Sequence, residues 1–131
     1  MKKARIATLS EAGAPGSAGA AMWITTLVGY AVYNHRGEEV GDIKDVMLEV
    51  HSGKVVYALL SFRAIVGLGE KVFPVPWHAL TLDSENRRFL LKVDKHRLAD
   101  APGYHKNRSP NITAPAWVRD IDSFYGAAEG D

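Results

Sequence analysis

Four acidic side chains gather within eight positions of the sequence, close enough to do proton chemistry or to bind a hard cation. They are Glu38, Glu39, Asp42 and Asp45. Neighbouring carboxylates can relay protons, and their oxygens suit Mg²⁺ or Ca²⁺. Arg36 and Lys44 lie among them, however, and charged side chains at a turn or an edge strand ordinarily serve solvation. Solvation is therefore the favoured interpretation, with a proton or cation site as the alternative.

Other reactive residue types are present without the spacing that catalysis or metal binding needs. None of the five histidines belongs to an H-x-H, H-x-x-H or H-E-x-x-H pattern. The chain has no cysteine, which excludes disulfides, thiolate metal sites and a cysteine nucleophile. Ser61 lacks the G-x-S-x-G context of a hydrolase, and Gly67-x-Gly69 lacks the third glycine of a nucleotide loop. We therefore expect no enzyme activity, no cofactor and no metal site.

An apolar turn is the strongest candidate for contact with another protein. The segment "AIVGLG" (64–69) holds Ile65, Val66 and Leu68 between residues that mark a turn. Turns ordinarily lie at the surface, and a surface loop with three large apolar side chains either folds back on its own domain or meets a partner. The sequence leaves both interpretations open, and the partner could be a second copy of the chain.

A C-terminal helix raises the same question. It is predicted to begin at Thr113 or Ala114, and Trp117, Ile121 and Phe124 recur along it at helical spacing. This apolar stripe closes the end of its own domain or docks on a neighbouring protomer or a membrane surface. The intramolecular interpretation is favoured. Asp120 and Asp122 beside the stripe disfavour binding to anionic lipid.

Composition limits the partners that the chain can have. At 131 residues with 47% hydrophobic content and a net charge of +1, it is one small domain without a general attraction to nucleic acid or anionic lipid. Basic residues between Arg87 and Arg108 are interrupted by acidic ones, so nucleic acid is not the expected partner. No run approaches the roughly 18 apolar residues of a membrane span. We therefore expect a cytoplasmic protein, with peripheral membrane association as the remaining membrane contact.

The candidate carboxylates and the apolar turn are expected to be positioned by short β-strands at hairpin spacing. Strands are predicted at 30–34, 39–50, 55–62, 71–76 and 87–93. A helix at 95–100 follows them, with Asp94 as its expected N-cap. The phase of Ile43 differs from that of Val46 and Leu48, which indicates a bulge near Lys44–Asp45. Pairing of 43–50 with 54–62 is the firmest prediction, and the set of strands favours an antiparallel barrel or strongly bent sheet.

The stretch "EKVFPVPWHAL" (70–80) needs its own explanation, because proline cannot donate to a sheet ladder. Pro74 and Pro76 share one phase, so their missing donors fall on the same edge of the strand. That arrangement costs no ladder bond at an unpaired edge. Trp77 is then expected to start a short turn and to fill the end of the barrel.

In order and spacing, these features resemble the PRC-barrel domain. The resemblance covers about residues 27–93 and rests on Gly29, Gly37-Glu38, Gly41-x-Ile43-x-Asp45-Val46, Ser52-Gly53-Lys54 and Pro74-Val75-Pro76-Trp77. It implies a small antiparallel β-barrel, a fold found in the cytoplasmic part of the photosynthetic reaction-centre H subunit and in a ribosome-maturation factor. The chain shows neither the membrane helix of the first nor the N-terminal domain of the second, so neither function transfers.

The sequence as a whole predicts a mainly β, non-enzymatic interaction module that forms homo-oligomers. The expected parts are a flexible tail rich in Ala, Gly and Ser (1–22), a PRC-type barrel (23–101), and a loop with a C-terminal helix that packs on the barrel or on a partner (102–131). The alternative function is that of an accessory subunit in a membrane complex of photosynthetic electron-transfer type, or a factor in ribosome or RNA processing.

Overall fold

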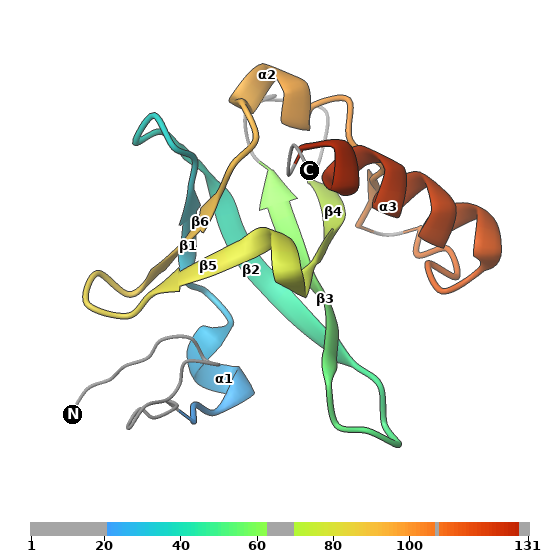
Figure 1. The fold of residues 1–131 in the computed structure, drawn as a ribbon, viewed down its shortest axis with the longest axis horizontal. Coiled ribbons are helices and arrows are strands. Elements are labelled where there is room, and N and C mark those ends of the chain that lie inside the picture. Colours follow the sequence, from blue (N-terminus) through green and yellow to red (C-terminus); the bar gives the residue numbers. More distant parts are fainter. Residues whose placement is uncertain (1–20, 63–69, 107, 129–131) are drawn as a thin grey trace.

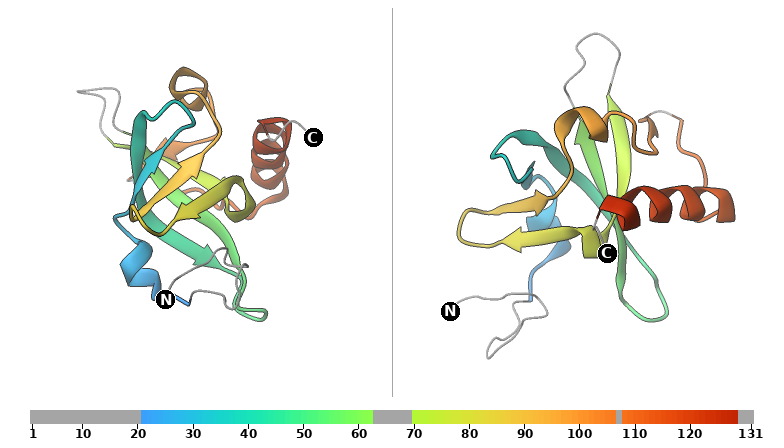
Figure 2. Two further views of the ribbon diagram at one scale, coloured as in Figure 1. Left: turned by 60° about the vertical axis from the view of Figure 1, so that its left-hand side comes forward. Right: turned by 45° about the horizontal axis from the view of Figure 1, so that its top comes forward.

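One strongly bent sheet forms the centre of the molecule (Figures 1 and 2). The computed structural model describes residues 21–62, 70–106 and 108–128. The strands in the described part are β1 (Ala31–Tyr33), β2 (Glu39–Leu48), β3 (Val55–Phe62), β4 (Lys71–Pro76), β5 (Leu80–Asp83), β6 (Arg88–Leu91) and β7 (Tyr104–His105). Their order is β5-β6-β1-β2-β3-β4-β7. The predicted mainly β class is therefore confirmed.

Small helices connect and flank this sheet. They are α1 (Ile24–Leu27), the 3-10 helix η1 (Trp77–Ala79), α2 (Lys95–Leu98) and α3 (Pro115–Ala128). Pro115 opens α3, as the sequence predicts, because its fixed φ suits the first turn and its missing N–H would lack a helical partner there. α3 packs against β4 and lies outside the sheet (Figure 1).

The predicted pairing of β2 with β3 is confirmed, together with its bulge. The register shifts between Ile43 and Asp45, so Ile43 is buried although its sequence phase differs from that of Val46. The two strands approach so closely at Gly41 that an added Cβ would overlap the carbonyl oxygen of Ser61. A side chain at that position would therefore separate the strands, which explains the glycine.

Strand residues supply most of the core, and β4 is buried on both of its faces. The largest fully buried side chains of the core are Val32, Ile43, Leu60, Val72, Phe73, Val75, Phe89, Leu91, Leu98, Ile121 and Tyr125. The last two come from α3, so this helix completes the core of its own chain. Each such side chain contributes roughly 1.5–3 kcal/mol when fully buried.

The proline strand ends as the sequence predicts. β4 stays paired with β3 through Pro74, opposite Leu59, and Pro76, opposite Tyr57. The missing donors therefore face the other edge, where β7 pairs only with Lys71 and Val72. Trp77 follows in η1, is half-buried, and packs edge-on against Phe89 with ring centroids 5.5 Å apart. It fills the bend between β4 and β5.

Several predictions about elements are wrong in detail. β5 and β7 were not predicted. β5 has only four residues, and β7 has only two and lies in a segment that was predicted to be a loop. β1 and β6 pair in parallel, although hairpin spacing predicts antiparallel neighbours throughout. α2 ends at Leu98 rather than at residue 100. Residues 1–20 of the expected tail lie outside the described residues.

Candidate functional site

The carboxylates that were candidates for proton or cation chemistry are dispersed by the fold. Glu38 accepts a hydrogen bond from the side-chain amide of Asn34 at 2.7 Å, and Asp45 accepts one from the backbone N–H of Val46 at 2.8 Å. Only Glu39 and Asp42 line one pocket, a polar space of about 430 Å³. In the described part of the chain, no group of three His, Asp or Glu side chains could hold a metal ion. The arrangement thus supports turn formation and solvation.

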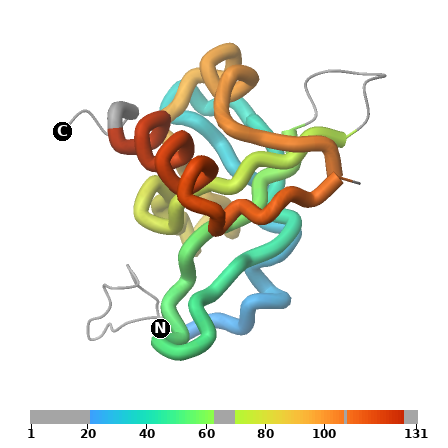
Figure 3. Tube along the Cα trace, turned by 90° about the vertical axis from the view of Figure 1, so that its right-hand side faces the viewer, coloured from blue at the N-terminus to red at the C-terminus, as the bar shows by residue number. Residues whose placement is uncertain are grey.

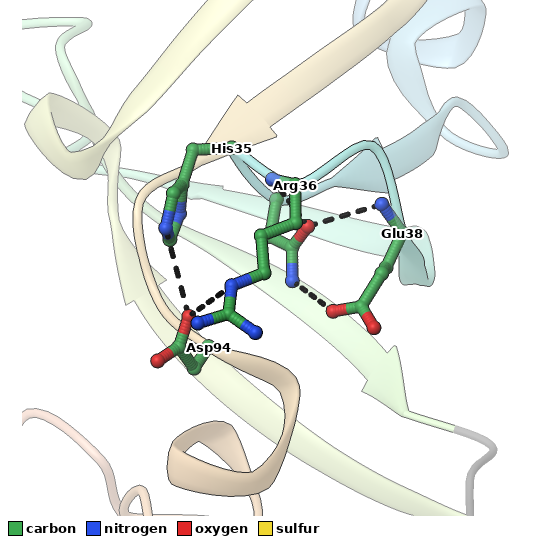
Figure 4. Close-up of polar contacts among 5 residues, drawn as sticks. His35, Arg36, Glu38 and Asp94 are labelled. Atoms are coloured by element: carbon green, nitrogen blue, oxygen red, sulfur yellow. Dashed lines mark hydrogen bonds and ion pairs between the residues drawn. The ribbon is translucent and has the colours of Figure 1, made fainter.

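A polar cluster instead ties the β1–β2 turn to α2 (Figure 4). Asn34 is buried, and its side-chain oxygen accepts hydrogen bonds from the backbone N–H groups of Arg36 at 2.9 Å and Glu38 at 3.0 Å. His35 and Arg36 both point toward Asp94, with nitrogen–oxygen distances of 3.6 Å. The buried Asp94 Oδ1 has no hydrogen-bond partner, so the guanidinium of Arg36 and the ring nitrogen of His35 are the polar groups that face it.

Asp94 precedes α2 as predicted, but its role differs from the expected cap. Its side chain makes no capping hydrogen bond to the helix. The carboxylate faces the β1–β2 turn instead, where it lies 3.6 Å from the guanidinium of Arg36 and from the ring of His35. The sequence signal for a cap was correct about the position and wrong about the interaction.

A second polar cluster closes the base of the predicted contact loop. Ile65, Val66 and Leu68 lie outside the described residues, so their partner contact stays a prediction. Glu70, which follows them, accepts a hydrogen bond from Ser61 Oγ at 2.5 Å and lies 3.3 Å from Lys44 Nζ. The hydrogen bond from Ser61 and the positive charge of Lys44 lower the pKa of Glu70 to about 2.

The predicted C-terminal stripe faces inward for the most part. Ile121 is fully buried, so it has no surface to offer a partner while α3 packs on its own sheet. Trp117 and Phe124 are half-buried. Trp117 packs edge-on against Tyr104, with ring centroids 6.0 Å apart. The arrangement corresponds to the intramolecular alternative for Ile121, and it leaves Trp117 and Phe124 with exposed surface.

The structure also shows an apolar surface that the sequence patterns did not single out. In the described part of the chain, exposed large hydrophobic side chains occur in two segments only, residues 23–28 and 47–56. They are Trp23, Ile24, Val28, Met47, Leu48, Val50 and Val56. We call the second group, residues 47–56, the hairpin tip. Most of these residues fall within the strands predicted at 39–50 and 55–62, but a strand pattern does not show where the neighbouring strands stop.

The hairpin tip is exposed because β2 and β3 extend beyond the ends of their neighbouring strands. β1 pairs with β2 no further than Asp42, and β4 pairs with β3 no further than Tyr57. Figure 3 shows the two strands continuing together beyond the rest of the sheet. Val50, in the turn, is 83% exposed. A two-stranded ribbon with apolar side chains on its surface is the part of this molecule best suited to contact another protein.

Comparison with known proteins bears on the β part of the molecule. The family model of the PRC-barrel domain matches residues 21–98, more than half of the chain. A search of curated proteins finds no match. Within the described residues, no helix has the length and apolar character required to cross a membrane. The matched range ends at α2, so α3 is an addition to the matched domain.

Proposed function

The chain belongs to the PRC-barrel family, and we propose that it works as a non-enzymatic interaction module that assembles with further copies of itself. One observation carries the proposal: the exposed large apolar side chains of the described residues are confined to the start of the domain and to the hairpin tip. Scattered apolar residues are normal on any surface, whereas a confined group marks a contact.

The hairpin tip has the properties of a contact that forms between copies. Met47, Leu48 and Val56 are each 37–38% exposed on a ribbon that has lost its neighbouring strands. A ribbon of two strands is marginally stable in water by itself, so burial against another surface would stabilise it. In a dimer with two-fold symmetry the same patch of both subunits forms the contact, so each apolar residue is buried once in each subunit.

The start of the domain extends this surface. Trp23 is 81% exposed, and Ile24 and Val28 are each 37% exposed on and beside α1. α1 and the hairpin tip lie toward the same end of the molecule in Figures 1 and 3. An indole of this size contributes strongly to an interface when it is buried. Both segments could therefore belong to one interface.

Analytical ultracentrifugation tests the proposal. We expect wild-type protein at tens of micromolar to sediment as a dimer or higher oligomer, and Val50→Asp to shift it toward the monomer. The matched control is Thr81→Asp, which adds the same charge at an exposed position of β5 and should leave the mass unchanged. A monomeric wild type would refute the proposal.

The contacts predicted from the sequence are tested in the same way. Leu68→Asp and Trp117→Ala should also reduce the mass if Ile65, Val66, Leu68, Trp117 and Phe124 contribute to assembly. The alternative function is accessory binding to a membrane complex or to a ribosomal particle. A pull-down from the native host that recovers membrane proteins, ribosomal protein or RNA, together with a monomeric wild type, would favour that alternative.

A further inference from the structure

A groove with mixed aromatic and acidic walls lies between α3 and the loop that joins α2 to β7. Its volume is about 650 Å³, within the usual range of binding pockets. The residues that define its chemistry are Asp100, Pro102, Trp117, Asp120 and Phe124. Neither the apolar hairpin tip nor the polar cluster at the β1–β2 turn contributes to it.

Helical spacing determines how α3 presents these groups. Trp117, Asp120 and Phe124 are separated by three and four residues, so they follow one another on successive turns of the same helix face. The Asp120 carboxylate is therefore flanked by two aromatic side chains. Asp100 lies on the facing wall, which brings a second carboxylate to the same groove.

Both walls of the groove are held by the core. Phe124 packs on the buried Tyr125 with ring centroids 4.8 Å apart, and Trp117 packs on Tyr104. On the other wall, the backbone at Gly103 lies so close to the core that an added Cβ would be 2.6 Å from the ring of Phe73. The groove is therefore formed before any ligand enters, which reduces the entropy cost of binding.

The two carboxylates are available to a cation. Asp100 and Asp120 are exposed and have no ion-pair partner among the described residues. Arg97 already uses one aromatic wall, since its guanidinium carbon lies 4.6 Å from the ring centroid of Phe124. The Trp117 end of the groove, which Asp120 flanks one turn along α3, has no such internal cation in the described part of the chain.

We propose that this end of the groove binds an arginine side chain presented by a partner polypeptide. A guanidinium group stacks on an indole and donates paired hydrogen bonds to carboxylates, whereas an ammonium group offers only a point charge. Among the described residues, arginine lies on an aromatic ring twice, Arg97 on Phe124 and Arg88 on Tyr33. Nucleic acid and anionic lipid would be repelled by Asp100 and Asp120.

Fluorescence anisotropy with a labelled peptide, acetyl-Gly-Arg-Gly-Arg-Gly-amide, tests the proposal. We expect saturable binding by the full chain, and a loss of about tenfold in affinity in Asp120→Asn, because a stacked cation loses its carboxylate partner. Asp122→Asn is the matched control: it removes the same charge from an exposed position of α3 that does not line the groove. A peptide with citrulline in place of arginine should bind at least tenfold more weakly than the arginine peptide.

Three results would overturn the proposal: no saturable binding by wild type, equal losses in Asp120→Asn and Asp122→Asn, or equal binding of the citrulline peptide. The proposal does not depend on self-association. Val50→Asp leaves the groove intact, so peptide binding should persist in that variant whether or not the wild type is oligomeric. Failure of one proposal is therefore distinguishable from failure of the other.

Discussion

The two turns that bound β2 use their polar groups for different purposes. At the β1–β2 turn, the buried side chain of Asn34 donates a hydrogen bond to the Glu38 carboxylate. It also accepts hydrogen bonds from the backbone N–H groups of Arg36 and Glu38. At the β2–β3 turn, Glu49 accepts hydrogen bonds from the N–H groups of Ser52 and His51, within an exposed loop. Both turns are internally hydrogen-bonded, but only the first is also attached to the rest of the domain.

The attachment determines what each turn contributes. His35 and Arg36 connect the first turn to Asp94 ahead of α2, so that turn helps to hold two parts of the domain together. The second turn stabilises itself locally and leaves Val50 in solvent. A change in the first turn should therefore reduce folding stability, whereas a change in the second should reduce assembly and leave the fold intact.

The largest expected effect on stability comes from Asn34→Ala. The substitution removes three hydrogen bonds and leaves two N–H groups of the turn without their acceptor. We expect the free energy of unfolding to fall by about 2–3 kcal/mol, because an orphaned buried donor costs more than an average hydrogen bond contributes. Urea denaturation measures this change.

Asn86→Ala is the control for Asn34→Ala. Asn86 is exposed in the β5–β6 turn, where its amide donates to Asp83 at 2.8 Å. Its replacement should cost less than about 1 kcal/mol, as is usual for exposed turn residues. Equal losses in the two variants would contradict the distinction between an attached and an unattached turn.

A smaller effect is expected at the cluster of Glu70, which joins the middle of β2 to the start of β4. The pKa of Glu70 is about 2, below its ordinary 4.5, owing to the hydrogen bond from Ser61 and to Lys44. A depressed folded-state pKa gives stability that is fully present above pH 4.5 and is lost as pH falls toward 2. Because the Glu70 side chain is 24% exposed, we expect only about 1 kcal/mol after solvent screening.

Unfolding free energies of wild type and Glu70→Gln, measured between pH 6 and pH 2.5, test this expectation. The variant should be less stable than wild type at pH 6 and should approach it at the acid end. A constant difference at every pH would show that Glu70 contributes through packing and not through its charge.

Local patterns predicted the parts of the fold that local chemistry determines. The pairing of β2 with β3, the bulge near Asp45 and the start of α3 at Pro115 all follow from strand phase and proline geometry. The parallel pairing of β1 with β6 could not be predicted, since it joins strands far apart in the sequence. The sequence also did not predict how far β2 and β3 extend beyond β1 and β4, because the ends of the neighbouring strands depend on tertiary pairing.

The candidate site residues also fall into those that local spacing predicted and those that depend on tertiary folding. Trp117 and Phe124 were predicted as contact residues from helical spacing alone. Asp100 was not, because tertiary folding brings the loop that carries it against α3. Val50 and Met47 were expected to be ordinary strand residues, and their exposure depends on where neighbouring strands end. A single sequence shows which side chains share a face, but not what covers that face.

The smallest effect on the isolated subunit is expected from Val50→Asp, and it gives the sharpest test of the comparison. Val50 lies in a turn, where aspartate is well tolerated, and its side chain is 83% exposed. At low protein concentration the free energy of unfolding should therefore change by less than about 0.5 kcal/mol. Thermal unfolding followed by circular dichroism measures this difference.

Concentration then separates the two turns. If the hairpin tip assembles copies of the chain, the wild-type Tm rises with protein concentration, because association stabilises only the folded state. Val50→Asp should abolish that rise, whereas Asn34→Ala should lower Tm at every concentration and keep the rise. If Tm in Val50→Asp rises with concentration as in wild type, the hairpin tip is not the interface, and self-association would have to use another surface.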